Sequence, residues 1–377
     1  MIVVVTCLCM TLHSAHAASV GETEADRPWV MSYYTDYQTG YLLPKDVDYS
    51  LMTHIVVGAI GVTATGTVRE PGKTAGGMWH DLATDIEVRA HREGVKTLLW
   101  LGGPGKQDAF KSASSDQYRA SFVRNILTLV DALKYDGVDI NWEPIRPEDA
   151  SSTLALVRDL RAARPTLLIT LPIDWVPTTV ANKKDLSLYL QLASYVDRLF
   201  IMSYSMAGPW PGWKSWHGSA LAGHTSSAPS SIRSSVAAYV AAGVPKNKLG
   251  IGIGAYATAW EHPVRSVRQT LPKTFVPADV HTMSMRTMYE RYYSKKAEKW
   301  DGVAKVPYLS FKKARGDFSC GFLSYENRKS VLEKARYVKS EKLGGVLVWN
   351  IGTDFLPEEL NKGNRFPLLR AVRDVVH

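Results

Sequence analysis

Three carboxylates and one amide lie within ten residues of each other in the stretch YDGVDINWEP, residues 135–144. They are Asp136, Asp139, Asn141 and Glu143. In an extended strand, successive side chains point to opposite faces. Asp139, Asn141 and Glu143 therefore share one polar face, and the apolar residues between them share the other. Carboxyl groups gathered on one face are candidates for transferring protons in a catalytic site.

Eight short apolar segments, which alternate with amphipathic helical stretches, position this motif. We predict strands near residues 29–34, 53–60, 97–102, 137–143, 167–171, 199–204, 249–254 and 345–349. Between the third and fourth strands, apolar residues recur at spacings of three and four, which is typical of a helix packed along one stripe: Tyr118, Phe122, Ile126, Leu129, Val130 and Leu133. A further helix is expected to end at Pro165. This alternation predicts an α/β fold, a (β/α)8 TIM barrel, as one domain over residues 26–377.

In such a barrel the active site lies at the carboxyl ends of the strands, so Glu143 is expected nearest the mouth. The alternative for this motif is a polar plug inside the barrel. One crossover, about residues 257–343, is unusually long and contains aromatic and β-branched runs. We therefore expect a small inserted lobe between strands seven and eight, at about residues 257–320.

The N-terminus carries a short apolar run followed by Ala15, His16 and Ala17, the small-residue pattern of a secretory cleavage site. It lacks the usual early Lys or Arg, and a buried N-terminal strand is the alternative. We predict a signal peptide at residues 1–17 and a secreted protein without stable membrane insertion, because the run is too short to span a bilayer. Cys7 and Cys9 lie in this segment, so a processed chain would keep only Cys320 and could form neither an internal disulfide nor a thiolate zinc site.

The formal charge of +9 and the pI near 9.2 could indicate a polyanionic partner, but the basic residues are scattered. The densest run, residues 328–342, is predicted to form an amphipathic helix with Val331, Ala335 and Val338 facing inward and its charges in solvent. We expect no nucleic-acid partner and a monomer. The histidines form no metal-ligand pattern, and neither a phosphate-binding glycine loop nor a Gly-x-Ser-x-Gly motif occurs, so no metal or cofactor is expected.

The segment DGVDINWE resembles the DxxDxDxE signature of glycoside hydrolase family 18, the chitinases and endo-β-N-acetylglucosaminidases. Asp136, Asp139 and Glu143 match, and Asn141 replaces the third aspartate. Other segments are similar to the first strand, the sixth strand and the approach to the eighth strand of the family: RPWVMSYYTDY, LFIMSYSMAGPW and FLSYENRKSVLEKARYVKSEKLGGVLVWNIGTD. The resemblance covers nearly the whole chain after the signal peptide.

The resemblance implies a retaining mechanism in which the N-acetyl group of the substrate is the nucleophile. Glu143 would then be general acid and base, Asn141 with Asp139 behind it would hold the N-acetyl group, and Tyr204 would bond the N-acetyl oxygen. Asn141 can accept a hydrogen bond but carries no charge and cannot relay a proton.

A second departure from the family replaces an aspartate that contacts substrate by Ser205. With two anions missing near Glu143, we expect a lower pKa for this acid than in its relatives and poor turnover at pH 7. Trp100 and Ala59 stand where the family has a small and an aromatic residue, and we predict a compensating exchange between neighbouring strands.

Sugar rings present apolar faces to aromatic side chains at a barrel mouth. The resemblance implies that Trp349 floors the cleavage subsite. We also predict substrate contacts for Tyr33, Trp210, Ser205 and Asp136. For Trp213 and Trp216, which follow in the same loop, plain loop packing is an equal alternative.

These residues favour a hydrolase of β-1,4-linked N-acetylglucosamine polymers or oligomers such as chitin. The alternative is a lectin-like relative that binds chitin oligosaccharides without cutting them, since such proteins lose signature residues. The presence of Glu143 favours the enzyme.

Overall fold

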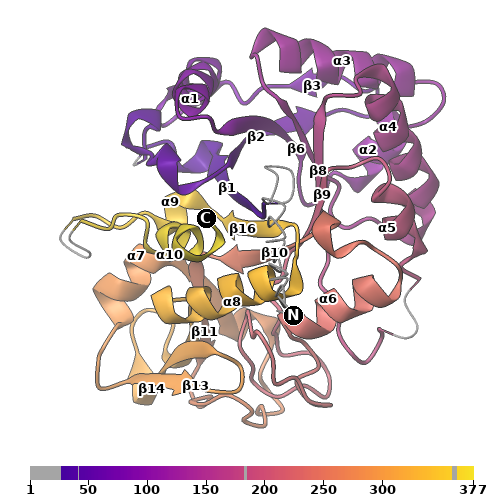
Figure 1. The fold of residues 1–377 in the computed structure, drawn as a ribbon. Helices are drawn as coiled ribbons and strands as arrows, with labels where there is room; N and C mark the ends of the chain where they lie inside the picture. The colour runs from indigo at the N-terminus through magenta and orange to yellow at the C-terminus, as the bar shows by residue number, and fades with distance from the viewer. Residues whose placement is uncertain (1–26, 41, 182–184, 359–362) are drawn as a thin grey trace, which may run out of the picture.

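The protein is described here from a computed structural model, which covers residues 27–40, 42–181, 185–358 and 363–377. Eight parallel strands close into a barrel in the order β1-β16-β10-β9-β8-β7-β6-β2, and β2 pairs back with β1. The strands are β1 (Trp29–Thr35), β2 (His54–Val62), β6 (Lys96–Gly102), β7 (Gly137–Asn141), β8 (Leu168–Ile173), β9 (Arg198–Ile201), β10 (Leu249–Gly254) and β16 (Gly345–Trp349). The predicted (β/α)8 barrel is confirmed (Figure 1).

Helices cover the outside of the barrel between the strands. The longer ones are α1 (Trp79–Arg92), α3 (Arg119–Ala132), α4 (Ala150–Ala163), α6 (Ile232–Ala241), α8 (Arg328–Glu341) and α10 (Pro367–Val376), and α2 (Gln107–Ala113) and α5 (Ser187–Leu192) are shorter. The predicted stripe on α3 is buried at Phe122, Ile126 and Val130. Helix α4 ends before Pro165, with Arg164 already in the extended conformation that a residue preceding proline prefers.

Two predicted strands are longer than the observed ones. β7 ends at Asn141 and β9 ends at Ile201, whereas the apolar pattern predicted ends at residues 143 and 204. Pro144 has no N–H to donate to a strand ladder, and Ser205 has a φ of 51°, in the left-handed region. The chain therefore turns out of the barrel wall at the positions where the candidate site begins.

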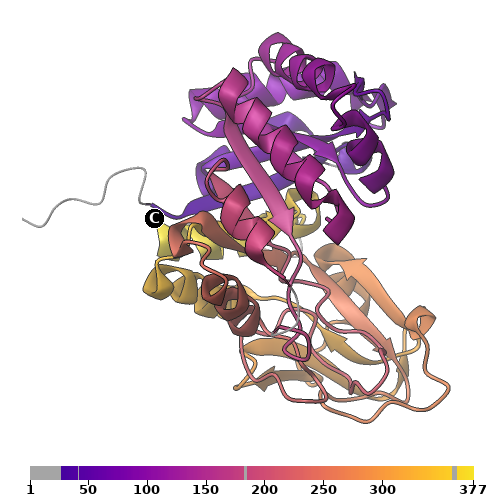
Figure 2. The same ribbon diagram turned by 90° about the vertical axis from the view of Figure 1, so that its right-hand side faces the viewer.

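A five-stranded antiparallel sheet between β10 and α8 forms the predicted lobe beside the barrel (Figures 1 and 2). Its strands are β11 (Tyr256–Glu261), β12 (Val280–Ser284), β13 (Glu298–Asp301), β14 (Val306–Arg315) and β15 (Cys320–Ser324), in the order β12-β11-β15-β14-β13. The lobe has apolar cores of its own, one around Met288 and Leu323 and one around Trp260 and Phe322. Its first strand starts only two residues after β10 ends, so the lobe is built directly on the mouth of the barrel.

A layer of large side chains fills the barrel interior and includes Tyr33, Trp100 and Phe200. Ala59 packs against this same cluster, and β2 pairs with β6, which agrees with the predicted exchange of volume between Ala59 and Trp100. In the amphipathic helix α8, Val331, Ala335 and Val338 are fully buried, as predicted.

The signal peptide predicted at residues 1–17, with Cys7 and Cys9, lies outside the described residues. Within the described part of the chain, no helix combines the length and apolar character that crossing a membrane requires. The same residues contain no group of three or more histidine, cysteine or acidic side chains placed to hold a metal ion. Cys320 is a buried free thiol of the lobe.

Candidate active site

Strand β7 brings the polar face of the motif into the barrel. Asp139 is fully buried and Asn141 is 3% exposed, and Asn141 lies opposite Gly102 of β6. On the other face of the strand, Trp142 stacks on Phe110 of α2 with ring centroids 5.0 Å apart. The alternation predicted from the sequence is therefore confirmed, because the amide and the carboxylates point inward and the apolar residues point toward the helices.

The carboxyl ends of the strands surround a cleft of about 560 Å³. Four residues predicted for the site line it together: Asn141, Glu143, Tyr204 and Trp349. Ser205 lines it as well, and β12 of the lobe contributes a wall through Thr282, Met283 and Ser284. The cleft is therefore formed jointly by the barrel and the lobe.

Asp139 lies beneath the cleft and is held by two hydroxyl donors. Tyr33 Oη donates to Asp139 Oδ2 at 2.7 Å, and Thr170 Oγ1 donates to Asp139 Oδ1 at 2.5 Å. Burial raises the pKa of Asp139 to about 7, although both hydrogen bonds act in the opposite direction. Asp139 is thus a buried support for the strand and does not line the cleft.

The side-chain amide of Asn141 connects the indole of Trp100 to the carboxyl group of Glu143. In the amide orientation that gives both of its groups complementary partners, Asn141 Oδ1 accepts from Trp100 Nε1 at 3.2 Å and Asn141 Nδ2 donates to Glu143 Oε2 at 3.2 Å. A carbonyl oxygen has two lone pairs, so Asn141 Oδ1 can accept a second donor from a bound ligand. Trp100 therefore does more than fill volume, because it fixes the orientation of this amide.

Glu143 has the properties of a carboxylic acid that is protonated near neutral pH. Burial, and to a smaller extent the negative charge of Asp174, raise its pKa to about 7. We expected a shortage of the acid form at pH 7 from the loss of two family aspartates. The shift of its pKa from that of an ordinary glutamate is upward, and a lower pKa than in family members stays a prediction.

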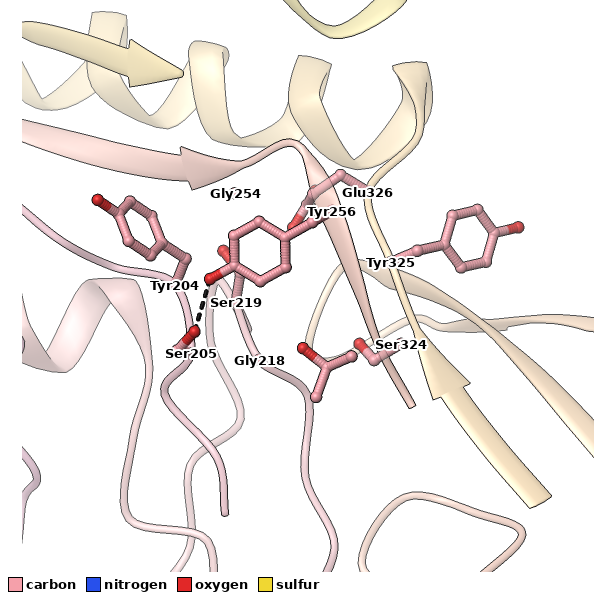
Figure 3. A pocket seen from close by; sticks show the side chains of 10 residues that line it. Tyr204, Ser205, Gly218, Ser219, Gly254, Tyr256, Ser324, Tyr325 and Glu326 are labelled. Atoms are coloured by element: carbon pink, nitrogen blue, oxygen red, sulfur yellow. Dashed lines mark hydrogen bonds between the residues drawn. The ribbon is translucent and has the colours of Figure 1, made fainter. Parts of the chain in front are cut away.

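Tyr204 and Ser205 follow β9 at the wall between barrel and lobe. Ser205 is exposed, and its hydroxyl lies 2.6 Å from Tyr256 Oη on β11 (Figure 3). Behind this pair is a small pocket with about 10 Å³ of space, enough for about one water molecule. The ring centroid of Tyr204 lies 6.1 Å from that of Tyr256, and burial raises the pKa of both phenols, so they are neutral donors.

Trp349 forms the floor of the cleft with Trp100, to which it packs edge to face at a centroid distance of 5.4 Å. Tyr33 packs edge to face against both indoles from below. The prediction that Tyr33 contacts substrate is wrong in this structure. Its side chain is 1% exposed, and its hydroxyl is engaged by Asp139, so Tyr33 supports the floor from inside the barrel.

Trp210 is 38% exposed and belongs to a cluster beside the cleft. Its ring centroid lies 4.7 Å from Trp213 and 5.8 Å from Trp175, which follows β8. Trp216 is instead fully buried and donates from Nε1 to the carbonyl of Ser230. For Trp216, plain packing is thus the correct alternative, whereas Trp210 and Trp213 form an aromatic surface next to the barrel mouth.

Asp136 does not belong to the cleft, so its predicted contact with substrate is wrong. It precedes β7 at the opposite end of the barrel, where it accepts from Lys96 Nζ at 2.9 Å and from the Thr97 backbone N–H at 2.9 Å. His91 Nε2 lies 2.7 Å from the same carboxylate. These partners lower the pKa of Asp136 despite its burial, so its role is to join β6, β7 and the end of α1.

A sequence profile of the glycosyl hydrolases family 18 matches residues 29–354, which include the whole barrel and the lobe. The chain belongs to glycoside hydrolase family 18. Among curated relatives, it is 26% identical to a probable endochitinase of Caenorhabditis elegans, over 92% of this chain and 59% of that protein. It is 21% identical to the chitinase-like mite allergen Der p 18.0101 of Dermatophagoides pteronyssinus, over 88% of this chain and 71% of that one.

Solved structures of this family share the fold. The Group IV chitinase of Ostrinia furnacalis superposes with a TM-score of 0.78 at 24% identity, over 93% of this chain and 99% of that one. YKL-39, crystallised in the presence of chitooligosaccharides, superposes with a TM-score of 0.77 at 18% identity, over 92% and 99% of the two chains. The family thus includes chitinases and proteins described only as chitinase-like, and membership identifies this chain as chitinase-like.

Sequence reasoning missed three residues around the cleft of this family 18 protein. Asp174 and Trp175 directly follow β8, and Tyr256 begins β11 two residues after β10. All three lie just past the carboxyl end of a barrel strand, where this fold places its site. Their position directly after a predicted strand could have identified them from the sequence. The site was instead predicted from the family signature, which covers strands four, six and eight.

Proposed function

We propose that this chain is a glycosidase that hydrolyses β-1,4-linked N-acetylglucosamine polymers or oligomers. The observation that carries the proposal is the convergence of Glu143, Asn141, Tyr204 and Trp349 on one cleft, with the pKa of Glu143 raised to about 7. A general acid is most effective when its pKa lies near the working pH. Glu143 is therefore suited to donate a proton at neutral pH.

In the first step, Glu143 gives its proton to the glycosidic oxygen as the bond from that oxygen to C1 breaks. The carbonyl oxygen of the substrate's own N-acetyl group forms the new bond to C1, which yields a cyclic oxazolinium ion and releases the shortened chain as an alcohol. The hydroxyl of Tyr204, neutral because burial raises its pKa, can donate to the N-acetyl oxygen and orient it.

In the second step, the carboxylate of Glu143 takes a proton from water while the water oxygen attacks C1 from the side that the leaving group occupied. The ring of the oxazolinium ion opens, and the N-acetyl group is restored. Two inversions give net retention of the β configuration. Glu143 is again protonated and ready for the next cycle.

The amide of Asn141 limits the rate of these two reaction steps. Its free lone pair can accept the N–H of the acetamido group and hold it for attack, but an amide offers only a dipole to the positive oxazolinium ion. We therefore expect correct positioning and weaker electrostatic stabilisation, and hence slow turnover.

The second candidate is a protein that binds chitin oligosaccharides without cleaving them. Asn141 and Ser205 are the observation in its favour, because each replaces an anion of the family pattern by a neutral group. The Trp349 floor and the cluster of Trp175, Trp210 and Trp213 would serve binding equally well. Similar structures solved with allosamidin, for the Ostrinia furnacalis Group IV chitinase, or in the presence of chitooligosaccharides, for YKL-39, support the ligand class for both candidates.

We also propose that the protein is exported. This rests on the small-residue cleavage pattern after the apolar run in residues 1–17, which lie outside the described residues. Mass spectrometry of the protein recovered from the medium of expressing cells tests it, since a chain that begins after Ala17 supports export and an uncleaved chain contradicts it.

The function is tested by incubating the purified protein with chito-oligosaccharides of four to six sugars and following the products by proton NMR. We expect shorter oligosaccharides whose new reducing ends appear first as the β anomer. Release of the α anomer first would contradict the substrate-assisted mechanism. Binding without any product at long incubation would favour the second candidate.

A further inference from the structure

A basic groove lies at the outer edge of the lobe, where β13 and β14 pair (Figure 1). It is an open depression of about 500 Å³. Five exposed cations line it: Lys296, Lys299, Lys312, Lys313 and Arg315. Among the described residues that line the basic groove, none is an aspartate or glutamate, and none also lines the substrate cleft. The folded chain thus gathers at one place cations that lie up to 19 positions apart in the sequence.

The five cations of the basic groove have no carboxylate partners. In the same stretch of chain, three carboxylates are each bound by a cation outside the groove, at 2.7 to 2.9 Å: Glu290 by Arg286, Glu298 by Lys295 and Asp317 by Arg291. Within the part of the chain that the structure describes, no carboxylate oxygen lies within 4.0 Å of a charged nitrogen of the five. Like charges held together repel each other, so an anionic ligand would relieve this repulsion.

Protection of a sheet edge accounts for only part of this arrangement. β13 is the last strand in the order of the lobe sheet, and lysines on an edge strand commonly prevent pairing with another chain. Lys299 on β13 and Lys296 just before it fit that purpose. The other three cations belong to β14, which is an inner strand of the same sheet. Edge protection therefore leaves most of the positive charge unexplained.

The shape and lining of the basic groove favour a linear polyanion with sulfate groups. A groove admits a chain, whereas a lipid surface would meet a flat face. The aromatic ring in the lining, Phe311, is 7% exposed, and the guanidinium of Arg315 lies over it at 5.4 Å from the ring centroid. This lining therefore offers no open ring on which a nucleotide base could stack. Four of the five cations are lysines, whose ammonium groups attract anions as point charges.

We propose that the basic groove binds a sulfated polysaccharide, at a site separate from the cleft that holds Glu143. Sulfate groups repeated along a chain can meet cations from β13 and β14 at the same time. Because the groove and the cleft share no residue, both can be occupied at once. The groove thus gives the protein a second glycan contact that depends on charge rather than on N-acetyl groups.

The experiment measures binding of the purified full chain to dextran sulfate, with unsulfated dextran as the ligand control. The groove variant combines Lys296→Gln, Lys312→Gln and Lys313→Gln. The matched variant combines Lys45→Gln, Lys73→Gln and Lys273→Gln, which removes the same charge from three exposed lysines outside the groove. We expect the affinity for dextran sulfate to fall at least about tenfold in the groove variant and less than about twofold in the matched variant.

The salt dependence of binding is the second readout. Kd should rise steeply with salt in the parent and less steeply in the groove variant, because fewer cations release counterions on binding. If the groove variant does not fold, Lys312→Gln with Lys313→Gln should still weaken binding by at least about threefold.

Three results would overturn the inference. The first is a parent that does not bind dextran sulfate. The second is an equal loss of affinity in the groove variant and the matched variant, which would mean that net charge rather than the groove attracts the polymer. The third is tighter binding of a single-stranded oligonucleotide, or of phosphatidylserine vesicles, than of dextran sulfate at the same concentration of anionic groups.

Discussion

Asn141 Nδ2 lies 3.2 Å from Glu143 Oε2, so an amide donates a hydrogen bond to the acid at the position where the family signature has a carboxylate. A donor of this kind favours the charged form of Glu143 and opposes the effects of burial and of Asp174. Burial and the negative charge of Asp174, taken without this hydrogen bond, raise the pKa of Glu143 to about 7.

Asn141→Asp should move the alkaline limb of the activity profile toward higher pH by about one unit or more. The change replaces a donor by a like charge next to Glu143, and both effects raise the pKa of the acid. The measurement is the pH dependence of kcat/KM for cleavage of a labelled chito-oligosaccharide.

Ser205→Asp, alone and combined with Asn141→Asp, completes this comparison. The two shifts should not add, because both act on the charge of one carboxyl group. A profile that stays unmoved in all three variants would refute the electrostatic account of the site.

Glu143→Gln should stabilise the folded protein at neutral pH but not at pH 4. The folded pKa of about 7 exceeds the unfolded value of about 4.3, so the stability contributed by protonated Glu143 is complete below pH 4 and is lost as pH rises to 7. A glutamine remains neutral throughout. The advantage in Tm of the variant over the parent should therefore grow between pH 4 and pH 7.5.

Glu148→Gln is the matched control for this stability experiment, since the side chain of Glu148 is 56% exposed. Its Tm should follow that of the parent at every pH. An advantage of Glu143→Gln that is constant across the range would mean that the folded protein does not hold this carboxyl in its neutral form.

The barrel could be predicted from the sequence because its strands and helices are local patterns of period two and period 3.6. The depth of a residue within the barrel is not local. Tyr33 was expected at the mouth, yet it lies midway along β1, where the interior layer of side chains is closed by Trp100 and Trp349 above it. The loop tryptophan Trp216 was equally ambiguous, because the lobe that buries it is assembled from residues far along the chain.

Asp136 shows a different limit of sequence reasoning. It belongs to the signature by spacing, but it precedes Gly137, where β7 starts, and only residues late in a strand reach the mouth. Asp174 shows the converse. It belongs to no signature, yet it directly follows β8 at the carboxyl end of that strand.

Asp136→Asn should reduce stability without changing the activity of the folded protein. The variant loses a charge-assisted acceptor shared by Lys96 and the backbone N–H of Thr97, which is worth about 1–3 kcal/mol. Because the pKa of Asp136 is lowered in the folded state, the deficit should be present above pH 4 and should vanish as pH falls below the folded pKa. Urea unfolding of the parent and the variant at pH 7 and at pH 3 measures this deficit. Normal stability of the variant together with lost cleavage would instead indicate that Asp136 acts in the catalytic site.

Trp349→Ala should weaken binding of chito-oligosaccharides by about tenfold or more, since the floor of the cleft loses its largest apolar face. Trp300→Ala is the matched control, because Trp300 lies on β13 of the lobe, under Lys329 Nζ at 4.0 Å, and does not line the cleft. Calorimetric titration of both variants measures the difference. Equal affinities in the two variants would contradict the assignment of the floor.

The central claim is that Glu143 is the acid and base of a working glycosidase. The most direct test compares the rates at which the parent and Glu143→Gln cleave a labelled chito-oligosaccharide, with the affinity of both proteins measured alongside. The account predicts measurable cleavage by the parent, a loss of at least about a hundredfold in the variant, and nearly equal affinities, because glutamine preserves the shape of the site and removes only the transferable proton. Cleavage by Glu143→Gln at the rate of the parent would contradict the account.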